Sequence, residues 1–138
     1  MANDFRSFNV ACDAFTAKVK LAPGTVQKRI AFDLFGRIIK KTPVDTGRAR
    51  ASWTIAGGQA DRAVAPVGQT AYPIPQVPLG LPLTPGEPIW ISNNLPYIVR
   101  LEEGHSKQAP AGMVAVSIAE VEVGMRQLIT EGLKDAGL

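Results

Sequence analysis

The sequence predicts one α+β domain over residues 1–138, in which two N-terminal helices and a long C-terminal helix pack on a small, mainly antiparallel sheet. Apolar residues recur at helical spacing in three segments, and two short segments between them have the composition of strands. Because helices and strands are segregated along the chain, the α+β class is favoured over a parallel α/β fold. With 138 residues and 46% hydrophobic composition, the chain is long enough to bury a core of its own.

Two helices are expected in the first part of the chain. The first spans Asp4 to Lys20, and its apolar stripe consists of Phe5, Phe8, Cys12, Phe15 and Val19. The second spans Thr25 to Lys41, and its stripe consists of Val26, Ile30, Leu34 and Ile38. Lysines suit the C-terminus of this second helix, and Pro43 stops it.

The remaining elements are shorter, apart from the last. Residues 50–55 alternate polar and apolar side chains, which predicts a half-buried strand that ends at Gly57-Gly58, with Ser52 and Trp53 on opposite faces. Residues 89–92 predict a second strand. A short helix is expected from near Pro96 to Gly104, a loop over 105–112, and a long final helix from Val114 to about residue 135.

Residues 63–88 form a proline-rich arm or loop between the two strands. No formal charge occurs from Ala63 to Gly86, but the prolines in this stretch exclude a membrane-spanning helix, since each removes a backbone donor. Connections between strands are usually two to six residues long, so a segment of this length indicates a functional arm or a flap. Prolines favour extended backbone, and Pro73, Pro75 and Pro78 are the expected contacts with a partner.

The composition excludes several classes of protein. One cysteine and one histidine cannot supply an internal disulfide or a Cys/His zinc site, and no cofactor or metal is expected. The first residues lack the apolar run of a signal peptide, which favours the reducing cytoplasm.

Residues 1–69 carry 11 Lys and Arg against 5 Asp and Glu, whereas residues 70–138 carry 4 against 7. Such halves could steer copies of the chain together, or could be no more than solvated helix faces.

Catalytic patterns are sparse. Glu102, Glu103, His105 and Ser106 are close in sequence, but neighbouring residues rarely form a nucleophile, base and orienting group, and no nucleophile elbow or phosphate-binding loop is present. The sequence therefore predicts that the chain is not an enzyme. A hydrolase that uses Glu102 and His105 is a minor alternative.

A basic cluster provides a third alternative. Lys40, Lys41, Arg48 and Arg50 flank the turn before the first strand, and Lys40 and Lys41 are the candidates for facing DNA. No aromatic residues are interleaved with them for base stacking. A small basic DNA-binding protein is the alternative that this cluster leaves open.

The segment Thr42-Pro43-Val44-Asp45-Thr46-Gly47-Arg48 predicts a tight corner between the second helix and the first strand. Pro43 halts the helix, Asp45 is expected to accept backbone amides as in an Asx turn, and Gly47 supplies a left-handed position.

This corner, followed by Ser52-Trp53, is the first of three motifs that resemble one family. The second is Ile91-Ser92-Asn93-Asn94, and the third is Pro96-Tyr97 with Leu101-Glu102 and Gly104, leading through Ser106–Val114 into the final helix. In this order the motifs resemble the neck or tail-completion family of long-tailed double-stranded DNA bacteriophages, which includes minor tail proteins similar to protein Z of lambda-like phages.

The resemblance implies a structural virion protein, made in the bacterial host cytoplasm, that joins tail to head as a homo-oligomeric ring around the DNA channel. Six-fold or twelve-fold symmetry is expected for the ring. The expected partners are tail-terminator, tail-tube or head-closure and adaptor proteins. Genomic DNA is expected only to pass through the channel, and no membrane contact is expected. A tail-terminator or head-closure ring is the alternative within the same joint. By position, the residues that build the motifs are Pro43, Asp45, Thr46, Gly47, Trp53, Tyr97 and Gly104, whereas Arg48, Arg50 and Glu102 are expected to form charged contacts between subunits or with a partner.

Overall fold

The computed structural model describes residues 25–84 and 86–135, so the expected first helix, Asp4–Lys20, lies outside the described residues. In chain order the described elements are α2 (Thr25–Lys41), α3 (Arg48–Ala51), β1 (Trp53–Gly57), β2 (Ile89–Asn93), α4 (Ile98–Glu102) and α5 (Val114–Asp135). Within the described part, β1 and β2 form one antiparallel pair, and the predicted α+β class is confirmed.

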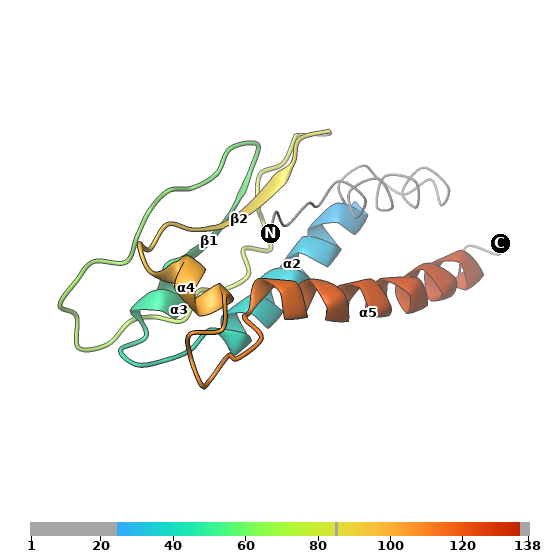
Figure 1. Ribbon diagram of the computed structural model, residues 1–138. Coiled ribbons are helices and arrows are strands. Elements are labelled where there is room, and N and C mark those ends of the chain that lie inside the picture. Colours follow the sequence, from blue (N-terminus) through green and yellow to red (C-terminus); the bar gives the residue numbers. More distant parts are fainter. Residues whose placement is uncertain (1–24, 85, 136–138) are drawn as a thin grey trace.

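The core lies where α2 meets α5 and the sheet (Figure 1). Helix α2 turns Leu34, Phe35 and Ile38 inward, because residues three and four apart share one face of a helix. The other elements add the following buried side chains to this cluster: Trp53 from β1, Leu95 and Ile98 around the start of α4, Met113 before α5, and Val121 from α5. Burial of this set supplies the main stabilising free energy of the domain.

The second strand lies where the sequence predicts it, and the first strand overlaps its predicted position. The register pairs Trp53 with Asn93 at one end and Gly57 with Ile89 at the other. Trp53 is buried, whereas Trp90 is exposed and donates its indole N–H to the carbonyl of Gly58 at 3.0 Å. Because α3 precedes Trp53 directly and α4 follows Asn93 closely, both short helices lie at the same end of the sheet (Figure 1).

The prediction that the first strand includes residues 50 and 51 is wrong. Residues 48–51 form the single helical turn α3, which the amide of Ser52 closes by donating to the carbonyls of Arg48 and Ala49 at 3.0 and 3.3 Å. Alanine favours helix, and Gly47 starts the turn in a left-handed conformation with φ 93°. Ser52 and Trp53 are therefore both buried rather than on opposite faces of a strand.

The connection between β1 and β2 contains the arm, residues 63–88. It forms a wide loop on the side of the molecule away from the free end of α5 (Figure 1). Its returning half packs on the domain, since Leu81 is buried and Val77 contacts the core cluster. Near its end, the side-chain amide of Gln27 donates to the carbonyl of Glu87 at 3.0 Å, which ties the arm to the beginning of α2.

Candidate functional site

The corner between α2 and α3 is organised around Thr42. The Thr42 amide donates to the carbonyl of Ile38 at 3.0 Å, and its hydroxyl donates to the same carbonyl at 2.7 Å. The indole N–H of Trp53 donates to the Thr42 hydroxyl at 2.8 Å. Thr42, Pro43 and Trp53 are buried, so the end of α2 is fixed to the start of β1. Pro43 and Trp53 thus hold the fold, as their assignment to the motif implies.

Asp45, Thr46 and Gly47 form the turn itself. Gly47 is buried and left-handed, as the sequence predicts. The expected Asx turn at Asp45 is not formed: in the described part of the chain, its carboxylate is exposed and has no hydrogen bond. One residue later, the hydroxyl of Thr46 accepts from the backbone amide of Arg48 at 3.3 Å, which is the contact expected of Asp45.

The corner holds the outgoing half of the arm. Arg48 donates from Nε to the carbonyl of Ala65 at 2.9 Å, while the amide of Ala65 donates to the hydroxyl of Ser52 at 3.1 Å. The Ser52 hydroxyl in turn donates to the carbonyl of Arg48 at 2.7 Å. These three hydrogen bonds link helix α3 and the adjoining Ser52 to the arm. Arg48, expected to contact another subunit, therefore has its Nε engaged within the chain.

Tyr72 makes a second connection between corner and arm. A side-chain carbon placed on Gly47 would lie 3.6 Å from Cβ of Tyr72, which shows how closely the arm passes the turn. The Tyr72 hydroxyl donates to the carbonyl of Pro66 at 2.6 Å and accepts from the amide of Gln69 at 3.3 Å. Between these bonds, Val67 stands at the tip of a turn and is 78% exposed.

The second motif is attached to the same corner through Asn93. Its side-chain amide donates to the carbonyl of Ala49 in α3 at 2.9 Å, and its side-chain oxygen accepts from the amide of Leu95 at 3.1 Å. One asparagine thus fixes the end of β2 both to α3 and to the segment that leads into α4.

The third motif is attached through Gln108. Its side-chain oxygen accepts from the amide of Val44 at 2.9 Å, and its side-chain nitrogen donates to the carbonyl of Val44 at 3.3 Å. The side chain of Gln108 therefore pairs with the corner backbone as a neighbouring strand would. Three segments far apart in the sequence meet at one place.

Glu102 has a role that the sequence did not suggest. Its carboxylate accepts from the amides of Met113 and Val114 at 2.7 Å each and from the amide of Ala115 at 3.0 Å. These amides begin α5 and have no acceptor within that helix, so Glu102 caps it from a distant part of the chain. The expected contact of Glu102 with another subunit stays a prediction, and its carboxylate already has three donors inside the domain.

The loop from Gly104 to Gly112 passes close to α4. Gly104 ends α4 with φ 90°, and a side chain there would collide with the carbonyl oxygen of Pro110. Tyr97 directly precedes α4 and is partly exposed, and its carbonyl accepts from the amide of Leu101 at 3.4 Å. His105 Nε2 lies 4.0 Å from Oε2 of Glu103, and both side chains are exposed. The pairing of His105 with Glu102 that a hydrolase would need is not formed.

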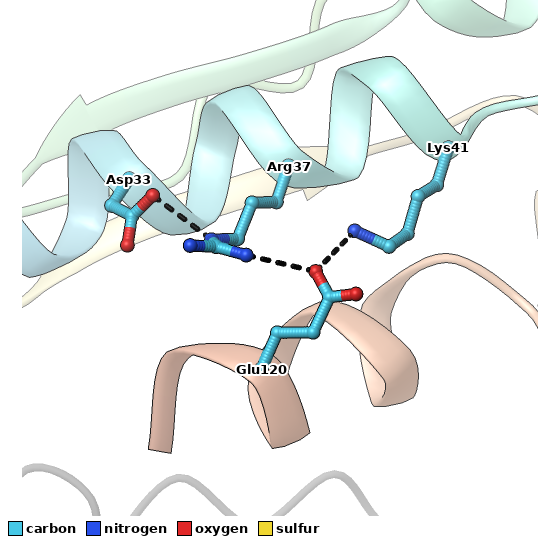
Figure 2. A network of polar contacts seen from close by, with 4 residues as sticks. All are labelled: Asp33, Arg37, Lys41 and Glu120. Atoms are coloured by element: carbon cyan, nitrogen blue, oxygen red, sulfur yellow. Dashed lines mark hydrogen bonds and ion pairs between the residues drawn. The ribbon is translucent and has the colours of Figure 1, made fainter. Parts of the chain in front are cut away.

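The basic residues at the end of α2 differ in their surroundings. Lys41 Nζ lies 2.6 Å from Oε1 of Glu120 in α5, and Arg37 contacts the same oxygen at 3.0 Å and Asp33 at 2.9 Å (Figure 2). The hydrogen bond from Lys41, followed by that from Arg37, lowers the pKa of Glu120, and the hydrogen bond to Glu120 raises the pKa of Arg37. Lys40 is exposed, so of the two candidates for facing DNA only Lys40 is without a partner in the described part.

Other surfaces of the described part offer little chemistry. Within residues 25–84 and 86–135, no three His, Cys, Asp or Glu side chains are grouped as metal ligands, and no helix combines the length and apolar character needed to cross a bilayer. An open groove runs between α2 and α5, with Ile30, Val121 and Met125 as its apolar lining. Pro75 and Pro78 are half-buried and Pro73 is exposed.

Comparisons of the chain with protein-family models, curated proteins and solved structures return no match.

Proposed function

We propose that this chain is a structural, non-enzymatic virion protein of the head-to-tail joint of a long-tailed DNA bacteriophage. It completes the tail as a ring of copies around the DNA channel, in contact with tail-terminator, tail-tube or head-closure proteins. A tail-terminator or head-closure ring is the alternative place in the same joint, and the neighbour that the chain binds distinguishes the two.

One observation carries this proposal: the three motifs form a single hydrogen-bonded unit. The corner contacts the second motif through Asn93 and the third through Gln108, and the third motif caps α5 through Glu102. Motifs that resemble one family in order should also meet in space if they belong to one fold. Their meeting supports the resemblance, which rests on sequence alone.

The arm supports an assembly role. Its outgoing half is hydrogen-bonded to the corner through Ala65, and Tyr72 passes close to Gly47. The arm nevertheless presents apolar side chains to solvent, among them Val67, Ile74 and Leu79. Exposed apolar side chains on a positioned, uncharged segment are typical of a surface that is covered by a partner.

The basic cluster favours the structural role over DNA binding. Lys41 pairs with Glu120, and Arg48 donates from Nε to the arm carbonyl of Ala65. Two of the four cations of the basic cluster therefore already have partners within the chain. A DNA-binding protein of this size would rely on such cations for phosphate contacts. We therefore expect weak, strongly salt-dependent binding to duplex DNA at most.

The decisive experiment is a cryo-electron microscopy reconstruction of the head-to-tail joint in particles assembled with this chain. The proposal expects density for the chain as a closed ring around the channel, and the copy number follows from the symmetry. A complete joint without this chain would overturn the proposal. Particles assembled without the chain should accumulate heads and tails that are not joined, and normally joined particles would argue against it equally.

A further inference from the structure

Arg50 lies at the junction of corner and arm without an acceptor. Its Nε is enclosed and has no hydrogen-bond partner in the described part of the chain, although the residue as a whole is only half-buried. Its Nη2 would lie 3.9 Å from a side-chain carbon placed on Gly47, so the guanidinium rests on the turn. Most enclosed polar groups in folded proteins are paired. Because Nε is enclosed, a carboxylate from another molecule would pair with the terminal nitrogens of this half-buried residue, which also make no hydrogen bond in the described part.

Apolar side chains are exposed on the arm segment that is hydrogen-bonded to α3, the helix that carries Arg50. The arm segment bonded to the corner carries Val64 and Val67, which are 37% and 78% exposed. Tyr72 holds the turn at Val67 from both sides, so the exposed side chain has a defined place. We call Arg50, Val64 and Val67 the corner–arm patch. Arginine is enriched in protein–protein interfaces, and exposed apolar side chains on a positioned segment favour contact with a partner.

A complementary patch occurs on the same chain. Glu122 on α5 is exposed and has no hydrogen bond in the described part, and the next residue, Val123, is 75% exposed. We call these two residues the α5 patch. The α5 sequence contains four acidic and two basic residues, so the helix has an excess of negative charge. Figure 1 places the middle of α5 away from the loop of the arm, so the two patches belong to different regions of the surface.

We propose that the corner–arm patch of one copy docks on the α5 patch of the next, with Arg50 paired to Glu122 and Val67 packed beside Val123. Two different patches on one chain make a head-to-tail contact, which repeats from copy to copy and closes into a ring when the rotation allows. This inference rests on the proposed function, because it names the contact between copies of the ring.

The test is a charge exchange in the full-length chain. Arg50→Glu and Glu122→Arg each bring like charges together, and each should weaken self-association about tenfold or more. The double variant restores opposite charges and should return association to within about threefold of the original. Self-association is measured by analytical ultracentrifugation over a concentration series, and ring formation by electron microscopy. Glu103→Arg, which reverses another exposed carboxylate, is the matched control and should leave association unchanged.

One further variant and the possible outcomes keep the contact falsifiable. Arg50→Gln removes the charge with little change in size and covers the case in which Arg50→Glu disturbs α3; it should weaken association as well. If the original chain assembles and the single variants assemble equally well, the contact is wrong and the proposed function stands. The same holds if folded single variants fail and the double variant does not recover. A chain that forms no oligomer, alone or in the joined particle, overturns both proposals.

Discussion

Replacing Glu102 by alanine should destabilise the domain at the beginning of α5. The carboxylate accepts from the amides of Met113, Val114 and Ala115, at distances of 2.7, 2.7 and 3.0 Å. Amides at the start of a helix have no acceptor within it. Because Met113 is completely buried, its amide cannot turn to water when the carboxylate is removed.

The expected magnitude follows from these contacts. Loss of a helix cap costs about 1 kcal/mol, and leaving a buried amide without an acceptor costs about 1–3 kcal/mol. The two contributions partly describe the same bonds and do not add in full, so the free energy of unfolding should fall by about 1–3 kcal/mol. For a domain of this size, that loss lowers the melting temperature by roughly 3–10 °C.

Two matched variants separate the cap from other effects. Glu102→Gln keeps one oxygen that can accept, but its amide nitrogen faces a backbone N–H, so about half of the loss is expected. Glu103→Ala removes the neighbouring exposed carboxylate, which makes no backbone contact, and should change stability by less than about 0.5 kcal/mol.

The assay is urea unfolding followed by tryptophan fluorescence, since Trp53 is buried in the folded domain. The linear dependence of unfolding free energy on urea gives the difference between variants. If Glu102→Ala unfolds within about 0.5 kcal/mol of Glu103→Ala, the three contacts do not stabilise α5 and the reasoning is refuted.

Three other predictions follow from particular contacts. Gly104→Ala should destabilise the domain by at least about 1 kcal/mol more than Gly68→Ala, because both positions have similar positive φ but only Gly104 meets a carbonyl, that of Pro110; equal melting temperatures would contradict this. Ser52→Ala should lower the free energy of unfolding by about 1–2 kcal/mol and speed proteolysis within the arm, since the hydroxyl accepts from the amide of Ala65 in the arm. An unchanged cleavage rate would show that this bond does not hold the arm. Because the pKa of Glu120 is lowered in the folded chain, the unfolded chain binds a proton at this carboxylate more tightly, so the ionised carboxylate stabilises the fold at neutral pH and ceases to do so as pH falls through the lowered pKa. The difference in unfolding free energy between the original chain and Glu120→Gln should therefore shrink on acidification, and growth of that difference would refute this reasoning.

The long elements could be predicted because many residues contribute to their patterns. Leu34 and Ile38 belong to a stripe that is repeated over four turns, and the stripe identifies the buried face of α2. The turn α3 has four residues, which is too short for a helical period to be visible. Its last residue, Ala51, and the following Ser52 and Trp53 fit the alternation of a strand equally well, so the predicted strand begins within α3.

The candidate site was harder to predict because its contacts join distant residues. Glu102 caps amides eleven or more positions later in the sequence, whereas recognisable capping patterns place the side chain within a few residues of the helix start. Arg37 and Lys41 are visibly on one face of α2, but nothing in the sequence identifies Glu120 as their partner. Local chemistry predicted that Asp45 would accept backbone amides, and Thr46 does so instead.

Most residues that resemble the phage family have partners inside the domain. Trp53 bonds to Thr42, Asn93 bonds to α3 and Glu102 bonds to α5, so these side chains explain why the corner keeps its shape. In the described part of the chain, Arg50 Nε has no hydrogen-bond acceptor and Val67 is exposed, and both residues lie on the corner or the arm that these contacts hold. It follows that chains with the same motifs can share the corner and still bind different neighbours. Exchanging the arm between two such chains should therefore transfer the choice of neighbour, whereas exchanging motif residues should change only stability.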